Sequence, residues 1–430
     1  MFKKIAKVAA LLLLSVWPLQ HANAVIGTMD TVPAATLLYP YFEVDLNSPT
    51  GKNTLIGLTN TSASAGLTRV TLWSNTGVPV YGFNIYLTGY DAISFSMRDV
   101  INGTLPVTAS AGQDPANLFS PKGPISQDIN YASCGGQMPY TAPVNASFVA
   151  DLKSMLTGGS STQAFPGQCV ATNLGDNVAR GYLTIDDVNQ CSLNNPNTPG
   201  YFGSGGSGIA TNRNVYLGDY TLIDPSQNIM NIENAVSIEA SSTAPETSVA
   251  GAYTFYGRLT NWTAADNREP LATNWVLQGE TNTSSAIVWR DPKVVPAAFS
   301  CATGRPSYAP LGQENITFFD PAAEPTLIPT TPTVINPFPL PAPTFGPVAT
   351  QIAAMNNATM QLPTSIKMGW VFMNLNTTVA PAGANPPVDP AASQSHVTVL
   401  RNHKNLSRLS TGAIATPLDS ATAARHNTFQ

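Results

Sequence analysis

Short apolar segments in which every second position is polar recur along most of the chain. Between residues 67 and 74, Val70 and Leu72 alternate with Arg69 and Thr71, and a similar alternation runs from residue 83 to residue 88. A period of two places successive side chains on opposite sides of a β-strand. These segments therefore predict strands that bury one face between stacked sheets.

Clusters of turn-forming residues, such as 47–51 and 74–77, separate these segments. The pattern predicts strands over residues 36–45, 54–59, 67–73, 78–87, 92–97, 181–188, 214–223, 235–240, 252–259, 275–277, 286–289, 316–319, 366–375 and 396–401. Closely spaced strands without helices between them favour antiparallel pairing. The predicted fold class is mainly β: an antiparallel β-sandwich of the immunoglobulin-like type, with one short helical excursion and long loops.

The helical excursion falls in a stretch that is rich in Gly, Pro and Ser. Its apolar residues recur at helical spacing on one face: Phe148, Val149, Leu152, Met155 and Leu156. Asn145 or Ser147 can cap its start, and Gly158 with Gly159 can end it. Two cysteines flank the helix, so we expect it to be fastened by a disulfide of its own.

Nine prolines between Asp320 and Pro347 exclude a regular helix or a central strand there and predict extended chain. The two strands predicted after this segment are too few for an independent domain, so they should join sheets built earlier. The proline-rich segment is therefore expected to cross the surface rather than to link two domains. The predicted organisation is 1–24 signal peptide, 25–105 N-terminal β-sandwich part, 106–178 loop-rich insertion with one helix, 179–319 second β-rich part, 320–347 proline-rich extended segment and 348–430 C-terminal strands and tail.

The first 24 residues predict export. Three lysines precede an apolar run from Val8 to Leu19, and small residues at Ala22 and Ala24 fit the site of a signal peptidase, so cleavage is expected before Val25. The run is shorter than the roughly 20 residues that span a membrane, and no other such run follows. The mature chain should thus have no transmembrane helix and lie in the periplasm or outside the cell.

The net charge of the mature chain limits the classes of partner that it can bind. Cleavage removes three lysines and no acids, which leaves 17 basic and 25 acidic side chains and a formal charge of −8. This mild negative charge argues against nucleic acid as a partner. Only 10% of the residues are charged, against about 25% in an ordinary soluble domain, so uncharged polar side chains must cover the surface. A surface polymer or a protein is the expected partner.

The four cysteines are Cys134, Cys169, Cys191 and Cys301. An even number in an exported chain predicts two disulfides with three possible connectivities. Sequential pairing closes the shortest loops and favours Cys134–Cys169 and Cys191–Cys301. No C-x-x-C spacing or paired histidine spacing occurs, so no metal centre built on these side chains is expected.

Candidate chemistry rests on five acids: Asp186, Asp187, Asp219, Asp224 and Glu233. Two carboxylates about 5–9 Å apart would suit hydrolysis of a polysaccharide, one as acid and one as base or nucleophile. Asp186 and Asp187 are neighbours in a strand, so they should point to opposite faces. The competing interpretation is that these acids bond backbone amides at turns and strand ends.

Calcium is the only cofactor that the same acids suggest, because carboxylate and carbonyl oxygens are its ligands. The regular Asp/Asn loop that ends in Glu is absent, and no phosphate loop, dinucleotide fingerprint or serine nucleophile elbow occurs. No cofactor is therefore expected, with calcium as the alternative.

Three stretches between residues 181 and 301 form a recognisable set: GYLTIDDVNQC over 181–191, the LGDY and IDP turns within 216–239, and IVWRDPK followed by FSC within 287–301. With the N-terminal strands, they resemble a group of secreted bacterial β-rich proteins without an assigned activity. The resemblance therefore implies no functional residues.

The sequence thus favours a secreted, non-catalytic protein with a surface, matrix or binding and adhesion role. An extracellular hydrolase acting on polysaccharide and a calcium-stabilised adhesion module are the alternatives.

Overall fold

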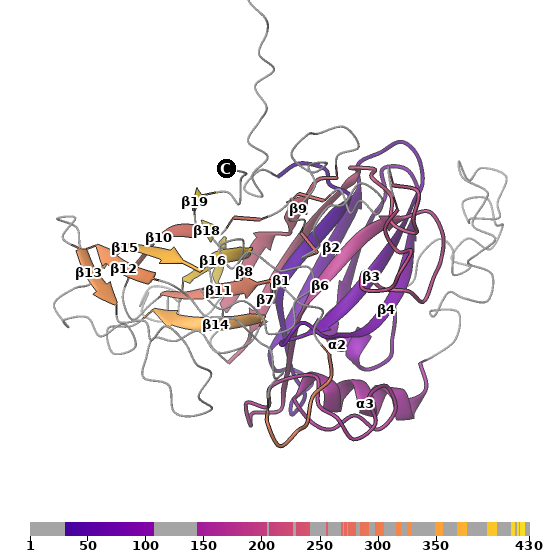
Figure 1. Ribbon diagram of the computed structural model, residues 1–430, viewed down its shortest axis with the longest axis horizontal. Helices are drawn as coiled ribbons and strands as arrows, with labels where there is room; N and C mark the ends of the chain where they lie inside the picture. Colours follow the sequence, from indigo (N-terminus) through magenta and orange to yellow (C-terminus); the bar gives the residue numbers. More distant parts are fainter. Residues whose placement is uncertain are drawn as a thin grey trace, which may run out of the picture.

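The computed structural model describes residues 31–106, 144–203, 206–226, 229–240, 255–256, 268–269, 271–272, 274–280, 284–291, 297–304, 315–319, 325–328, 349–355, 368–375, 394–401, 414–417, 419–420 and 422–425. This part of the protein is mainly β, with four sheets and two short helices. In Figure 1 the N-terminal strands form one packed body, and the orange and yellow C-terminal strands lie against one side of it.

One five-stranded sheet, here called the central sheet, organises the molecule. Its strands, in order, are β4 (Pro79–Leu87), β3 (Gly66–Ser74), β6 (Val178–Val188), β1 (Thr36–Asp45) and β9 (Val236–Ile238). All pairs are antiparallel, and β6 lies between β3 and β1. Strands that are more than 100 residues apart in sequence are thus direct neighbours.

A second five-stranded sheet packs against the central sheet. Its strands, in order, are β17 (Ile414–Pro417), β8 (Ile229–Asn234), β7 (Tyr216–Asp224), β2 (Asn53–Asn60) and β5 (Ala92–Ser96). The antiparallel prediction is wrong for one pair, because β17 runs parallel to β8. The other described pairs of named strands are antiparallel.

Two further sheets hold most of the later strands. One has the order β13 (Pro325–Ile328), β12 (Asn315–Phe319), β15 (Met368–Asn374), β10 (Asn274–Glu280) and β19 (Thr422–Arg425). The other has the order β14 (Thr350–Met355), β11 (Ser284–Arg290), β16 (Ser395–Arg401) and β18 (Asp419–Ser420). The two predicted late strands are β15 and β16, and as predicted they pair with earlier strands, β10, β12 and β11.

The proline-rich segment contains β13, which lies at the edge of its sheet. An edge strand tolerates proline because one side of it needs no ladder hydrogen bonds. The other residues of that segment, 320–324 and 329–347, lie outside the described residues.

The main core fills the space between the inner face of the central sheet and the second sheet. Val70, Leu72, Ile85 and Leu183 belong to it from the central sheet, as does Tyr220 from the second sheet. The residues of β3 that alternate with these, Arg69 and Thr71 among them, lie on the outer face of the central sheet and are nevertheless buried. The alternation therefore predicted correctly which side chains share a face of β3. It did not predict that the polar face would also be buried.

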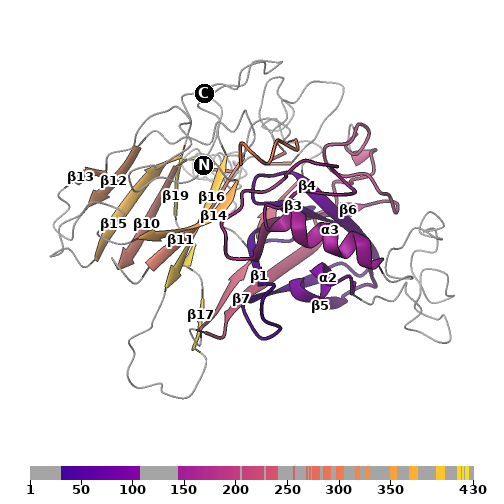
Figure 2. The same cartoon turned by 90° about the horizontal axis from the view of Figure 1, so that it is seen from below.

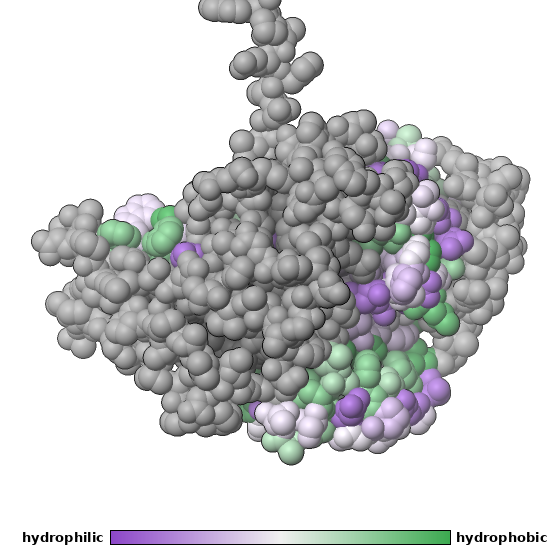
Figure 3. Space-filling model, in the orientation of Figure 1, coloured by the Kyte–Doolittle hydropathy of each residue, from purple (hydrophilic) through white to green (hydrophobic). Residues whose placement is uncertain are grey.

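Two helices close one end of this core (Figure 2). The predicted helix is confirmed as α3 (Ala146–Leu156), with the Asn145 side chain accepting from the Phe148 amide and a left-handed Gly158 after its end. A second helix, α2 (Met97–Ile101), was not predicted, because five residues are too few for a helical period to stand out. No helix in the described residues has the length and apolar character to cross a membrane. On the face drawn in Figure 3, apolar residues gather around α3 among polar ones.

The predicted disulfide connectivity is wrong. Cys169 is bonded to Cys301, 132 residues away, and Cys191 is also disulfide-bonded. Two backbone hydrogen bonds of 2.9 Å between Cys169 and Phe299 bring these segments together. Loop length governs the entropy of the unfolded chain, whereas sheet topology decides which cysteines meet. The helix is therefore not fastened by its own disulfide, and Cys134 lies outside the described residues.

The strand predicted over 252–259 is contradicted at Phe255 and Tyr256, which form a turn, and its other residues lie outside the described part. Both aromatic rings cover the outer face of the central sheet. Aromatic residues that pack onto a sheet from outside can have the composition of a strand without forming its ladder of hydrogen bonds.

Candidate functional site

A layer of polar side chains is buried on the outer face of the central sheet. Its members, here called the outer polar layer, are Thr36, Arg69, Thr71, Asn84, Thr184 and Asp186. Arg69 lies opposite Asp186 on one side and opposite Asn84 on the other, and Thr36 lies opposite Asp186. None is more than 4% exposed, so each polar group needs a partner within the protein or a bound molecule.

Asp186 is the centre of one half of this layer. Its Oδ1 accepts a hydrogen bond from Thr36 Oγ1 at 2.5 Å, and its Oδ2 accepts one from Tyr201 at 2.8 Å. The Tyr256 hydroxyl lies 2.8 Å from both oxygens. Burial, and then the Asp186 charge, raises the pKa of Tyr201 and of Tyr256 well above the ordinary value. Both phenols therefore stay protonated and donate to the carboxylate.

Arg268 supplies the countercharge. Its Nε lies 3.5 Å from Asp186 Oδ1 and donates to Thr36 Oγ1 at 2.5 Å, while its guanidinium lies 4.8 Å from the centre of the Phe202 ring. Both charged side chains are almost fully buried. A buried pair of this kind is costly to break, because the remaining charge is left in a medium of low dielectric constant.

Asp187 occupies separate surroundings, as the strand alternation predicted. Arg213 donates to both of its oxygens, at 2.9 and 3.0 Å, and Thr211 donates to Oδ2. This planar, two-point pairing is the strong geometry for arginine and a carboxylate. Asp187 and Asp186 share no hydrogen-bond partner among the described residues.

The three remaining candidate acids lie elsewhere. Asp219 is exposed and lies over Gly57, and Glu233 Oε1 accepts from the Asn234 amide at 2.9 Å. Asp224 accepts from the amide and hydroxyl of Ser226 and lies 3.6 Å from Lys52. Within the described part of the chain, no two of the five acids meet at a common partner. The interpretation as turn and strand-end acids fits Asp224 and Glu233, whereas Asp186 and Asp187 are held by side chains.

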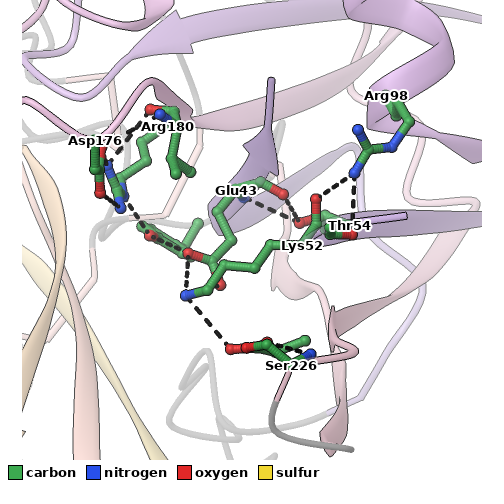
Figure 4. A network of polar contacts seen from close by, with 11 residues as sticks. Glu43, Lys52, Thr54, Arg98, Asp176, Arg180 and Ser226 are labelled. Carbon is green, nitrogen blue, oxygen red and sulfur yellow. Dashed lines mark hydrogen bonds and ion pairs between the residues drawn. The ribbon is translucent and has the colours of Figure 1, made fainter. Parts of the chain in front are cut away.

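Asp224 belongs to a second polar network, at the β1–β2 connection (Figure 4). Lys52 bridges Asp224 and Glu43, Tyr41 joins Glu43 to Arg180, and Arg180 donates to both oxygens of Asp176. The pKa of Asp176 is lowered, mainly by the hydrogen bonds that its carboxylate accepts from Arg180.

Arg98, also drawn in Figure 4, donates to four backbone carbonyls of the same connection. They are those of Asp45, Ser48, Gly51 and Lys52, at 2.7 to 3.0 Å. Arg98 therefore fastens this loop to α2, and its guanidinium has a structural role.

Exposed aromatic rings can bind sugars by stacking, and Trp73, Tyr201, Trp262 and Trp289 are candidates for such a platform by residue type. Trp73 stacks on Tyr182 with ring centres 5.6 Å apart, and Trp289 meets Tyr182 edge-on. Trp73, Trp289 and Tyr201 are at most 4% exposed, so none presents a ring to solvent. Trp262 lies outside the described residues.

Among the described residues, no group of three or more His, Cys, Asp or Glu side chains could hold a metal ion. The calcium alternative therefore gains no site from these acids in this part of the chain.

A buried histidine gives the fold a pH dependence. His396 is 3% exposed, contacts the Trp275 ring edge-on, and its Nε2 lies 3.0 Å from Thr398 Oγ1. Burial lowers its pKa from 6.5 to about 3. Between these values the unfolded chain takes up a proton that the folded chain does not. The free energy of unfolding should thus fall as the pH drops below about 6.5, by about 1.4 kcal/mol per pH unit from this group alone.

Urea unfolding of the wild type and of His396→Phe between pH 7 and pH 4 measures this contribution. In the variant, the free energy of unfolding should change less with pH, by about 1.4 kcal/mol per pH unit, because only His396 is removed and every other titrating group is retained. Equal slopes for the two proteins would contradict a neutral, buried His396.

Several residues of the outer polar layer were missed by the sequence reasoning. Arg69, Thr71 and Asn84 stood at alternating positions, which indicated a solvent-facing side, and nothing local to them indicates a cover. Tyr201, Tyr256 and Arg268 lie outside the named strands, and nothing in the sequence, including the strand expected over 252–259, indicated that their side chains reach Asp186. Only Asp186 carried a signal, because acids are scarce in this chain.

Comparison of the chain with protein-family models, with curated proteins and with solved structures gives no match. The fold and the site therefore define a mainly β, disulfide-bonded protein with a buried polar layer, and its function is inferred from these features alone.

Proposed function

We propose that this chain is an exported β-sandwich protein of the immunoglobulin-like type that binds a surface polymer or a protein outside the cytoplasm and does not catalyse a reaction. The observation that supports this proposal is the state of the candidate acids. They lie in separate surroundings, and the most buried of them, Asp186, already accepts from Thr36, Tyr201 and Tyr256. Paired-carboxylate hydrolysis needs two acids that face one substrate.

Two further features support export and the sandwich type. Stable disulfides are typical of oxidising compartments, and Cys169–Cys301 joins segments far apart in sequence. The central and second sheets share one apolar core, as the two sheets of a sandwich do.

Export is tested by expressing the whole chain in a bacterium and sequencing the N-terminus of the protein recovered from each fraction. We expect the periplasm or the medium to contain a chain that begins at Val25, because residues 22–24 fit a signal peptidase. Accumulation in the cytoplasm with an intact N-terminus would contradict the proposal.

The mature protein is then incubated with a panel of polysaccharides and matrix proteins, and both retention and product release are measured. Retention without release supports a binding role, whereas release of soluble sugar would favour the hydrolase.

A further inference from the structure

Three residues of the outer polar layer carry hydrogen-bonding groups that have no partner among the described residues. These groups are Arg69 Nη1, Thr71 Oγ1 and both side-chain polar atoms of Asn84. Arg69, Thr71 and Asn84 are at most 4% exposed. Buried polar groups in native proteins are almost always hydrogen-bonded, and an unpaired one destabilises the fold. Several together at one place indicate a bound molecule.

The sheet register brings three of these residues together. Arg69 lies directly opposite Asn84, and Thr71 lies directly opposite Gly82, two positions along the same face. Side chains directly opposite in an antiparallel pair have Cβ atoms about 4.5–5.5 Å apart. The Arg69 guanidinium extends over Gly82, since a Cβ built there would lie 2.7 Å from Nη2 and 2.9 Å from Cζ. The guanidinium is thus flanked by Thr71 and Asn84.

The charge of Arg69 indicates the kind of molecule. Its Nε and Nη2 donate to the carbonyls of Asn194 and Leu193, each at 3.1 Å, and neither carbonyl carries a countercharge. Among the described residues, no carboxylate forms an ion pair with Arg69, and the Asp186 opposite it is paired with Arg268. A buried cation without an anion is expensive, and water alone does not neutralise it.

We propose that Arg69, Thr71 and Asn84 form a binding site for a small oxyanion, either a free anion or the carboxylate, sulfate or phosphate group of a larger molecule. The site offers donors from all three side chains, and its acceptors, Thr71 Oγ1 and Asn84 Oδ1, are uncharged. A guanidinium with adjacent amide and hydroxyl donors is a strong arrangement for such a group. The site is independent of the proposed export and of the binding of a polymer or protein at the surface.

The site lies close to solvent. Strand β4 is the edge strand of the central sheet, and the segment with Leu193 and Asn194 lies over Arg69 on the neighbouring strand β3. Leu193 is 76% exposed, so the segment whose carbonyls accept from Arg69 has one side turned to solvent.

The test measures the melting temperature of the mature protein in sulfate, phosphate, acetate and glucuronate, each against chloride at equal ionic strength, with calorimetric titration of the active anion. The melting temperature should rise by about 1–2 °C for each tenfold increase in anion above its Kd. Sulfate or phosphate as the active probe identifies a tetrahedral group, and acetate or glucuronate a carboxylate. Responses equal to chloride for all four, or a Kd above about 10 mM, would overturn the proposal.

Asn84→Asp provides an internal carboxylate beside Arg69 and should abolish the anion response while raising the melting temperature without anion. The matched control is Asn173→Asp, which changes the net charge equally at an exposed side chain and should respond like the wild type. An undiminished response in folded Asn84→Asp would also overturn the site. If that variant does not fold, the wild-type titration still decides.

Discussion

Removal of the Cys169–Cys301 disulfide is expected to lower the free energy of unfolding by about 4–5 kcal/mol. The bond joins residues 132 positions apart, and a cross-link that closes so long a loop removes much of the entropy of the unfolded chain. Cys169 is 2% exposed and Cys301 is exposed, so Cys169→Ala with Cys301→Ser keeps an apolar group inside and a polar one outside. Guanidinium unfolding of this double variant and of the wild type gives the difference.

Two controls accompany this measurement. Wild type under reducing conditions loses the disulfide of Cys191 as well and should be less stable than the double variant. Digestion of the unreduced wild type should give a linked peptide pair that contains Cys169 and Cys301. A Cys134–Cys169 pair in that digest, or a double variant within about 1 kcal/mol of wild type, would contradict the connectivity.

Strand positions could be predicted from the sequence because their signal is local. The predicted 36–45 coincides with β1, and the predictions around β2, β3 and β4 are within one residue of each end, because alternation and turn clusters coincide there. Strands β8 and β14 were missed. Each has only six residues, too few for an alternation to stand out.

Pairing could not be predicted, because it depends on contacts between distant segments. Nothing near Thr36 indicates that β1 lies between β6 and β9, which follow it by more than 100 residues. The disulfide was assigned wrongly for the same reason. Sequential pairing rests on loop length, which is a property of the unfolded chain. The backbone hydrogen bonds between Cys169 and Phe299, which bring Cys169 close to Cys301, exist only in the folded chain.

The candidate site was predicted only in part. Asp186 was selected because acids are few, and its neighbour Asp187 was correctly expected on the opposite face. The partners of Asp186 could not be inferred, since Tyr256 and Arg268 reach it from covering loops. An alternating polar face normally indicates water, and a third layer of chain over that face leaves no periodic signal.

Replacement of Asp186 distinguishes a structural carboxylate from a catalytic one. Asp186→Ala should lower the free energy of unfolding by about 3–5 kcal/mol, because it leaves Arg268 buried without its ion-pair partner and removes the acceptor of Thr36, Tyr201 and Tyr256. Asp186→Asn preserves the shape and part of the accepting capacity and should cost less. Denaturant unfolding of both variants measures these losses.

The matched control is Asp219→Asn, an exposed acid of the same candidate set, which should change the free energy of unfolding by no more than about 0.5 kcal/mol. A catalytic acid would give the opposite pattern: Asp186→Asn would fold with nearly the stability of the wild type and lose turnover of a polysaccharide. Active sites commonly sacrifice stability for function, so a polar residue that can be replaced at little cost in a buried place indicates chemistry. The large loss expected at Asp186, together with an unchanged Asp219→Asn, would assign this carboxylate to holding the covering loops on the central sheet.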